Sequence, residues 1–115
     1  MKIENRTRGT MIAAEAQVAD SFLSRGRGLI GRPPLREGQA LVIRPCKGIH
    51  TWFMRYPIDV VYVDATDTVI DIETQIAPWR LCKPRRKASY VIELRAGTAT
   101  PDRVQIGDQI ALVSE

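Results

Sequence analysis

The sequence contains three residues whose side chains are suited to nucleophilic or metal chemistry. His50 is the only histidine, Cys46 precedes it by four residues, and Cys82 is the second cysteine. An imidazole lowers the pKa of a nearby thiol, so a Cys46 thiol activated by His50 would resemble a small hydrolase nucleophile. In an extended strand these two positions lie about 13 Å apart, so contact requires the chain to bend at Gly48.

The same side chains could in principle hold zinc. A structural zinc site uses four ligands, commonly with two cysteines at close spacing. The chain has one histidine and no C-x-x-C motif, which argues against such a site. We therefore predict no metal and no cofactor.

A second feature is the segment 50–59 (HTWFMRYPID), which combines aromatic residues with the charged residues Arg55 and Asp59. Its rings would offer a flat apolar wall, and its charged groups would orient a ligand. The predicted ligand-binding residues are His50, Trp52, Arg55, Asp59, Trp79 and Arg80. The structural alternative is a core strand, a bend at Pro57 and a local cap from Asp59.

Carboxylates on other predicted strands offer a further chemistry. Asp59, Asp71 and Glu93 could converge, and a carboxylate pair can serve as general acid and base. Their spacing establishes no pair, and carboxylates on strands are usually solvated. A non-enzymatic binding domain is our first hypothesis. A small hydrolase-like enzyme that uses Cys46 and His50, or these carboxylates, remains the alternative.

The chain is basic, with a formal net charge of +4 and a sequence pI of about 9.4. The basic residues cluster at Arg25, Arg27 and Arg32, and again at Arg80, Lys83, Arg85, Arg86 and Lys87. Such clusters attract phosphates, although most charge runs are solvated loops. No nucleic-acid-binding motif accompanies them. We expect an anionic small molecule or polymer as partner and regard nucleic acid binding through the 80–87 loop as the less favoured reading.

The length of 115 residues fits one domain, residues 1–115, and the 44% hydrophobic content indicates a folded core. No apolar run approaches the ~20 residues of a spanning helix, so we expect no membrane insertion. The start of the sequence has no apolar signal segment, so we expect cytoplasmic placement, reduced thiols and a monomer.

Short apolar runs with turn residues between them predict a mainly β (α+β) fold. We expect a compact small β-barrel or half-barrel of mostly antiparallel strands with one or two short helices. The predicted strands are 11–18, 40–44, 49–54, 58–63, 69–73, 89–94 and 109–113. Runs 58–63 and 69–73 should form a hairpin, 58–63 should be central, and 77–88 should be an irregular loop.

A short, glycine-weakened helix is predicted to begin at Asp20 or Ser21, and a helical turn at 98–104. Residues 26–31 spell GxGxxG. A dinucleotide site needs a helix that opens within the motif and an acidic residue about 20 positions later. Here the helix comes before the glycines and no such acid follows, so we reject a nucleotide site.

Four blocks occur in a fixed order along the chain. They are residues 25–32 (RGRGLIGR), 50–64 (HTWFMRYPIDVVYVD), 77–80 (APWR) and 90–99 (YVIELRAGTA). Together they resemble the family known as domain of unknown function 192, from about Phe22 to the C-terminus. The resemblance implies a compact, mainly β single domain and implies no reaction. Many relatives carry an export signal or lipid anchor, and this sequence departs from them there.

Overall fold

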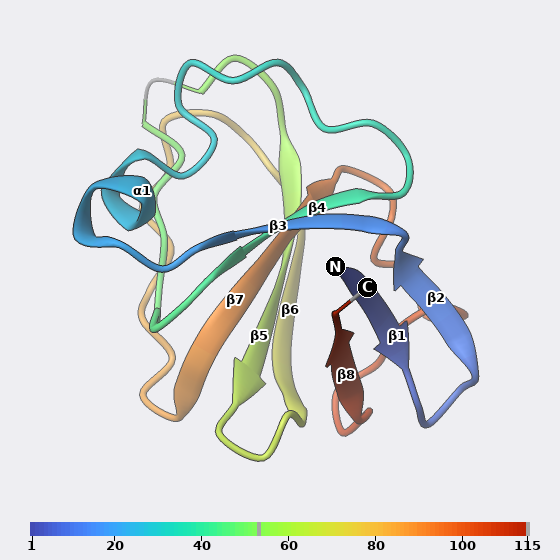
Figure 1. Cartoon of the computed structure of the whole chain (residues 1–115). Coiled ribbons are helices and arrows are strands. Elements are labelled where there is room, and N and C mark those ends of the chain that lie inside the picture. Colours follow the sequence, from blue (N-terminus) through green and yellow to red (C-terminus); the bar gives the residue numbers. More distant parts are fainter. Residues whose placement is uncertain (53, 115) are drawn as a thin grey trace.

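A computed structural model describes residues 1–52 and 54–114, and in that part of the chain the strands form two sheets (Figure 1). The three-stranded sheet has the order β2-β1-β8 and is antiparallel. The five-stranded sheet has the order β3-β4-β7-β5-β6. The elements are β1 Lys2–Asn5, β2 Thr10–Ala13, β3 Glu15–Ala19, α1 Phe22–Arg27, β4 Gln39–Ile43, β5 Ile58–Asp64, β6 Val69–Ile76, β7 Ala88–Arg95 and β8 Ile110–Val113.

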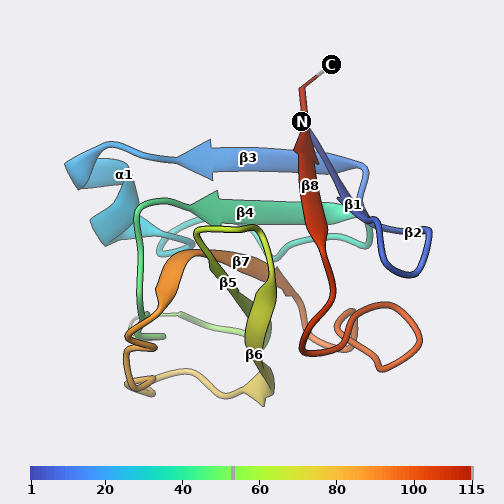
Figure 2. The same ribbon diagram turned by 90° about the horizontal axis from the view of Figure 1, so that it is seen from below.

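Strands β3 and β4 pair in parallel, whereas the other pairs are antiparallel. Parallel neighbours need a crossover connection, and α1 with the loop after it provides this one. The helix lies at the carboxyl ends of both strands (Figure 2). Ser21 caps it, because the Ser21 hydroxyl accepts from the Ser24 N–H and the Ser24 hydroxyl accepts from the Ser21 N–H, each at 3.1 Å. The predicted short helix and its Ser21 cap are confirmed.

The hairpin of β5 and β6 is also confirmed. Asp64 stabilises its turn by accepting from the backbone N–H groups of Thr66 and Thr68 at 2.9 and 3.0 Å. The predicted central position of 58–63 is confirmed, because β5 pairs with β7 on one side and β6 on the other and is buried on both faces, although β7 is the middle strand of the five. Both β5 and β7 are buried on both faces, so the burial pattern of the two strands is alike.

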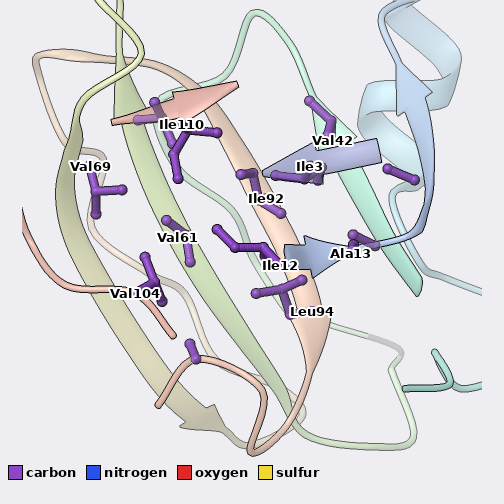
Figure 3. Close-up of a cluster of buried hydrophobic side chains, with 14 of the residues drawn as sticks. Ile3, Ile12, Ala13, Val42, Val61, Val69, Ile92, Leu94, Val104 and Ile110 are labelled. Atoms are coloured by element: carbon purple, nitrogen blue, oxygen red, sulfur yellow. The ribbon is translucent and has the colours of Figure 1, made fainter. Parts of the chain in front are cut away.

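Alternate residues of β7 point to two different hydrophobic cores. Ile92 and Leu94 enter the core between the two sheets, together with Ile3 and Ile110 (Figure 3). Val91 points to the opposite face and enters a second core with the segment that follows α1 and with the 49–58 segment. The second core therefore places α1 and those segments over one face of the five-stranded sheet.

Several predictions about the elements are corrected. A barrel is not confirmed, because the sheets do not close and the edge strands β3 and β6 do not pair with each other. The predicted strand 11–18 is two strands, β2 and β3, in different sheets. The predicted strand 49–54 reduces, in its described residues, to a single bridge between His50 and Leu81. The predicted turn at 98–104 is present as a single turn, because the carbonyl oxygen of Thr100 accepts from the N–H groups of Arg103 and Val104 at 2.9 and 3.0 Å. No helix among the described residues is long and apolar enough to cross a membrane.

Candidate functional site

Glu93 is a carboxylic acid in the middle of the five-stranded sheet. It lies on β7 opposite Leu41 of β4 and Val60 of β5. Side chains alternate along a strand, so Glu93 faces the same side as Val91 and enters the second core. Only 3% of the residue is exposed. The one charged residue in the interior of β7 is therefore buried under α1 and the loop that follows it.

The carboxyl group of Glu93 receives no hydrogen bond from the described residues, and its Oε2 is fully enclosed. Buried carboxyls are normally paired or hydrogen-bonded, because burial of the ionised form is costly. Burial raises the pKa of Glu93 to about 8. The positive charge of Arg32 lowers this pKa, but its effect is smaller than that of burial. The carboxyl group is therefore mostly protonated at neutral pH.

Glu93 lines a small cavity of about 150 Å³ between the sheet and the end of α1. His50 and Cys46 line the same cavity, and Ile43 and Met54 supply apolar walls. The Nδ1 atom of His50 is buried without a hydrogen-bond partner, and the imidazole lies 5.1 Å from the Trp52 ring between centroids. We call this space the central cavity.

Glycine backbone forms one wall of the central cavity. Gly28 has a φ of +52°, which glycine adopts without strain, and a Cβ there would lie 3.9 Å from Oε1 of Glu93. A Cβ on Gly48 would lie 2.9 Å from the Cα of Pro84. Only glycine therefore permits the close approach that sets the path of the chain between Cys46 and His50.

Cys46 is not an activated nucleophile. Its thiol donates to the carbonyl oxygen of Gly48 at 3.0 Å, and burial raises its pKa. A nucleophilic cysteine needs a lowered pKa and a neighbouring base. The Cys46 thiol is protonated and hydrogen-bonded to the backbone instead. Cys82 is also a free thiol, and burial raises its pKa as well.

Of the larger grooves that share lining residues with the central cavity, two are lined by cationic residues and by no carboxylate from the part of the chain that the structure describes. One, of about 760 Å³, shares the α1 residues Arg25 and Arg27 and ends at Lys47. The other, of about 890 Å³, shares Met54 and continues along residues 29–34 to Arg55 and Trp79. We call the central cavity and these two grooves together the α1 groove.

The lining of the α1 groove is strongly positive. Its cationic residues are Arg25, Arg27, Arg32, Lys47 and Arg55. Among the described residues, Glu93 is the only carboxyl residue that lines any part of the α1 groove. Because Glu93 is mostly protonated at neutral pH, no carboxylate charge offsets these cations within the groove. A groove lined with charges of one sign attracts ligands of the opposite sign.

Unsatisfied polar atoms are concentrated in the same place. The described part of the chain has four buried side-chain nitrogen or oxygen atoms without a hydrogen-bond partner, namely Nε of Arg25, Nε of Arg32, Nδ1 of His50 and Oε2 of Glu93. All four belong to residues that line the α1 groove. Each such atom costs about 1–3 kcal/mol unless a partner satisfies it. Their concentration in one groove makes the α1 groove the candidate site in this structure.

The structure brings three of the six predicted ligand-binding residues to this groove. His50 lines the central cavity, and Arg55 and Trp79 line the groove beside it. The Trp79 side chain is 61% exposed. Trp52 and Arg80 line none of the three parts of the groove. The backbone of Arg80 pairs with Thr51.

Asp59 lies on the other face of the sheet. Its carboxylate accepts hydrogen bonds from the backbone N–H groups of Gln75, Gly97 and Ala99, each at 2.9 Å. These bonds hold the end of β6 and the turn after β7 against β5. Asp59 is therefore a structural residue, although its partners are distant in sequence and do not form the local cap that the structural alternative predicted, and we leave Asp59 out of the site.

Arg85 in the predicted basic loop is engaged in structural contacts. Its guanidinium bonds to Asp71 at 2.8 Å and to Glu73 at 2.5 Å, and lies over the Tyr62 ring at 4.0 Å from the centroid. Arg85 is thus unavailable to a phosphate, and Asp71 is unavailable as a partner for Glu93. No group of three potential metal-ligating side chains is present among residues 1–52 and 54–114.

The sequence analysis identified the residues of this site separately but did not predict that they lie in one groove. Glu93 entered as one of three strand carboxylates, and the arginines of residues 25–32 as a separate basic stretch. The sequence signal for Glu93 is a single acidic residue inside the run SYVIEL, which is otherwise apolar from Tyr90 onward. A strand that is buried on both faces cannot solvate such a residue, whichever face it occupies.

The chain is similar in sequence to proteins of one uncharacterised family. A model of the family described as Uncharacterized ACR, domain of unknown function 192, matches residues 3–112. The chain is 33% identical to a UPF0127 protein of Pyrococcus abyssi over 97% of both chains, and 35% identical to one of Pyrococcus furiosus over 92% of this chain and 93% of that one. A protein of unknown function from Novosphingobium aromaticivorans superposes with a TM-score of 0.81 at 16% identity, over 96% of this chain and 82% of that one.

Proposed function

The chain belongs to the domain of unknown function 192 family, and membership of this family identifies no reaction. From the geometry of the site we propose that the protein binds small anionic molecules in the α1 groove. The observation that carries this proposal is the concentration of all four unsatisfied buried polar atoms in one positively lined groove. Without a ligand these atoms cost stability, and a bound polar molecule would satisfy them.

The groove offers a distinct role to each of its parts. The arginines at both ends attract the anionic group, and Arg55 lies on the side that also carries the exposed Trp79 ring. The ring provides an apolar surface for the body of the ligand. The central cavity receives a small polar end group beside Glu93 and His50.

Binding without covalent chemistry fits the state of the nucleophile candidate. The Cys46 thiol is half-buried and hydrogen-bonded to the carbonyl oxygen of Gly48, and partial burial raises its pKa, so it lacks the thiolate that a cysteine hydrolase needs. The basic loop 80–87 is a weaker candidate for nucleic acid, because Arg85 is already held by Asp71 and Glu73. The free thiols agree with a reducing compartment, and we place the protein in the cytoplasm as a monomer.

The test is a titration with citrate at low ionic strength, followed by backbone amide chemical shifts. We expect shifts to concentrate in residues 25–32, 46–56 and 79. The double variant Arg27→Ala/Arg55→Ala should weaken citrate binding about tenfold or more, because each arginine contributes a charge-assisted contact. Both side chains are exposed, so the fold should be unaffected.

The matched control is Arg86→Ala/Lys87→Ala, which removes the same charge from two exposed residues outside the groove. It should change the affinity by less than about twofold. Equal losses in both double variants would show that citrate responds only to net charge. That result, or shifts spread over the whole surface, would reject the α1 groove as the site.

A further inference from the structure

The carboxyl group of Glu93 has an unused donor and an unused acceptor in the central cavity. A protonated carboxyl presents one O–H donor and a carbonyl acceptor side by side. No described residue bonds to either oxygen, and Oε2 is fully enclosed. Glu93 is 3% exposed, so bulk water does not solvate the group freely. A single bound molecule that pairs with both oxygens would supply an acceptor and a donor at neighbouring positions.

Common end groups differ in how well they meet this requirement. A carboxylate offers only acceptors, so it would leave the carbonyl oxygen of Glu93 unpaired and place an anion against it. A ketone offers one acceptor and no donor. A primary carboxamide carries an N–H donor beside a C=O acceptor and forms two parallel hydrogen bonds with a carboxylic acid. Its second N–H remains for another acceptor on the cavity wall, and Nδ1 of His50 is an unpartnered polar atom there.

The dimensions of the central cavity suit such a group. Its volume of about 150 Å³ corresponds to about five water molecules at roughly 30 Å³ each. A four-atom amide such as acetamide fits within it, and its methyl group would meet Ile43 and Met54. A larger molecule would leave through the adjoining grooves, where the arginines lie.

We propose that the central cavity holds a primary carboxamide, paired through two hydrogen bonds with the carboxyl group of Glu93. The inference rests on the proposed function, because it names the end group of a ligand whose anionic part lies among the arginines of the α1 groove. The predicted ligand class is thus a small anionic molecule that carries a carboxamide.

The proposal links affinity to the proton on Glu93, which supplies the donor of one hydrogen bond. The charged and titratable groups around Glu93 come from every segment that covers the cavity: Arg25, Arg27, Arg32, Cys46, His50 and Tyr56. The Cys46 thiol and the Tyr56 hydroxyl both have a raised pKa, so between pH 6.5 and 9.5 neither replaces Glu93 as the main group to lose a proton.

The experiment is a titration of the full chain with acetamide, monitored by the methyl signal of Met54 and the amide signals of residues 25–30. At pH 6.5 we expect saturable binding with a Kd of about 1–10 mM, within the limit for a four-atom ligand. Acetate and acetone should bind about fivefold or more weakly, since each lacks the donor that a carboxamide has. At pH 9.5 the affinity for acetamide should also fall about fivefold or more, because ionised Glu93 has lost its proton.

Two variants isolate Glu93. Glu93→Gln keeps a donor and an acceptor, so it should bind acetamide within about twofold of the wild type at pH 6.5 and show no loss at pH 9.5. Glu93→Leu has neither and should lose saturable binding while it keeps a dispersed amide spectrum. Equal binding of acetamide, acetate and acetone, or unchanged binding by Glu93→Leu, would overturn the carboxamide proposal.

The outcomes separate this inference from the proposed function. Citrate binding that depends on Arg27 and Arg55, without saturable acetamide binding, would reject the carboxamide and leave the anion site standing. Acetamide binding that depends on Glu93, without citrate binding, would support the carboxamide and reject the anionic part of the proposed function.

Discussion

Glu93 and Asp59 lie on neighbouring strands, one residue apart in register, and point to opposite faces of the same sheet. Val60 of β5 is opposite Glu93 of β7, and Asp59 is opposite Leu94. Both residues are buried, yet the carboxylate of Asp59 accepts three backbone hydrogen bonds and the carboxyl of Glu93 accepts none from the described residues. One carboxyl therefore stabilises the fold, and the other has no hydrogen-bond partner among the described residues.

Substitution of Asp59 should weaken the fold. Asp59→Asn removes the charge and replaces one acceptor oxygen by an NH2 group. If the NH2 group replaces Oδ2, the N–H groups of Gly97 and Ala99 lose their acceptor, and if it replaces Oδ1, the N–H group of Gln75 loses its acceptor. We expect the free energy of unfolding to fall by about 2–4 kcal/mol, as measured in urea at pH 7. A loss below about 0.5 kcal/mol would contradict the structural role of Asp59.

Substitution of Glu93 by an apolar residue of similar size should have the opposite effect. Glu93→Leu places a hydrocarbon side chain among Leu29, Ile43 and Met54 and removes an unpaired polar group. We expect the free energy of unfolding to rise by about 1–3 kcal/mol in urea at pH 7. The gain would be the stability that the native chain gives up for its site. Destabilisation instead would mean that the fold depends on the carboxyl of Glu93.

The raised pKa of Glu93 predicts how stability depends on pH. Between its ordinary value of 4.5 and about 8, the folded protein keeps a proton that the unfolded chain has lost. The contribution of Glu93 to the free energy of unfolding is therefore largest below pH 4.5, declines as pH rises towards 8, and is constant above that. The decline is at most about 1.4 kcal/mol per pH unit, or up to about 5 kcal/mol in total.

Glu93→Gln cannot titrate at this position and is the matched control for that dependence. The difference in unfolding free energy between this variant and the wild type should grow in favour of the variant from pH 4.5 to pH 8. Urea unfolding at several pH values measures it, and other carboxylates cancel in the difference. A constant difference across this range would mean that Glu93 ionises normally in the folded protein.

Arg85 should matter to stability more than its basic neighbours do. Its contacts with Asp71, Glu73 and the Tyr62 ring are partly buried, so Arg85→Ala should lower the free energy of unfolding by about 1–2 kcal/mol. Arg86→Ala removes an exposed arginine and should change it by less than about 0.5 kcal/mol. Thermal unfolding of the two variants checks the difference, and equal effects would reject the structural role of Arg85.

Local patterns in the sequence predicted the elements with strong signals. The β5–β6 hairpin was found because two apolar runs flank a polar turn, and α1 was found because Ser21 supplies a cap. β1 was missed, since its four residues include only one hydrophobic residue, Ile3, and its buried Asn5 gains partners from distant residues Arg103 and Asp108.

The site was less predictable because it depends on which face a residue occupies. Both faces of β7 are buried, so periodicity could not show that Glu93 points towards α1. The donors to Asp59 come from residues 16 to 40 positions away, which no local pattern reveals. Register decides both roles, and only the folded sheet shows it.

The most direct test of the binding site is the side-chain carboxyl signal of Glu93, followed by carbon NMR from pH 3 to pH 10 with Glu93→Gln used for assignment. We expect a titration midpoint near 8 in the wild type. Acetamide should move the midpoint further up, because it binds the protonated form more tightly. A midpoint near 4.5 that acetamide leaves unchanged would show an ionised, solvated carboxylate and would contradict the account.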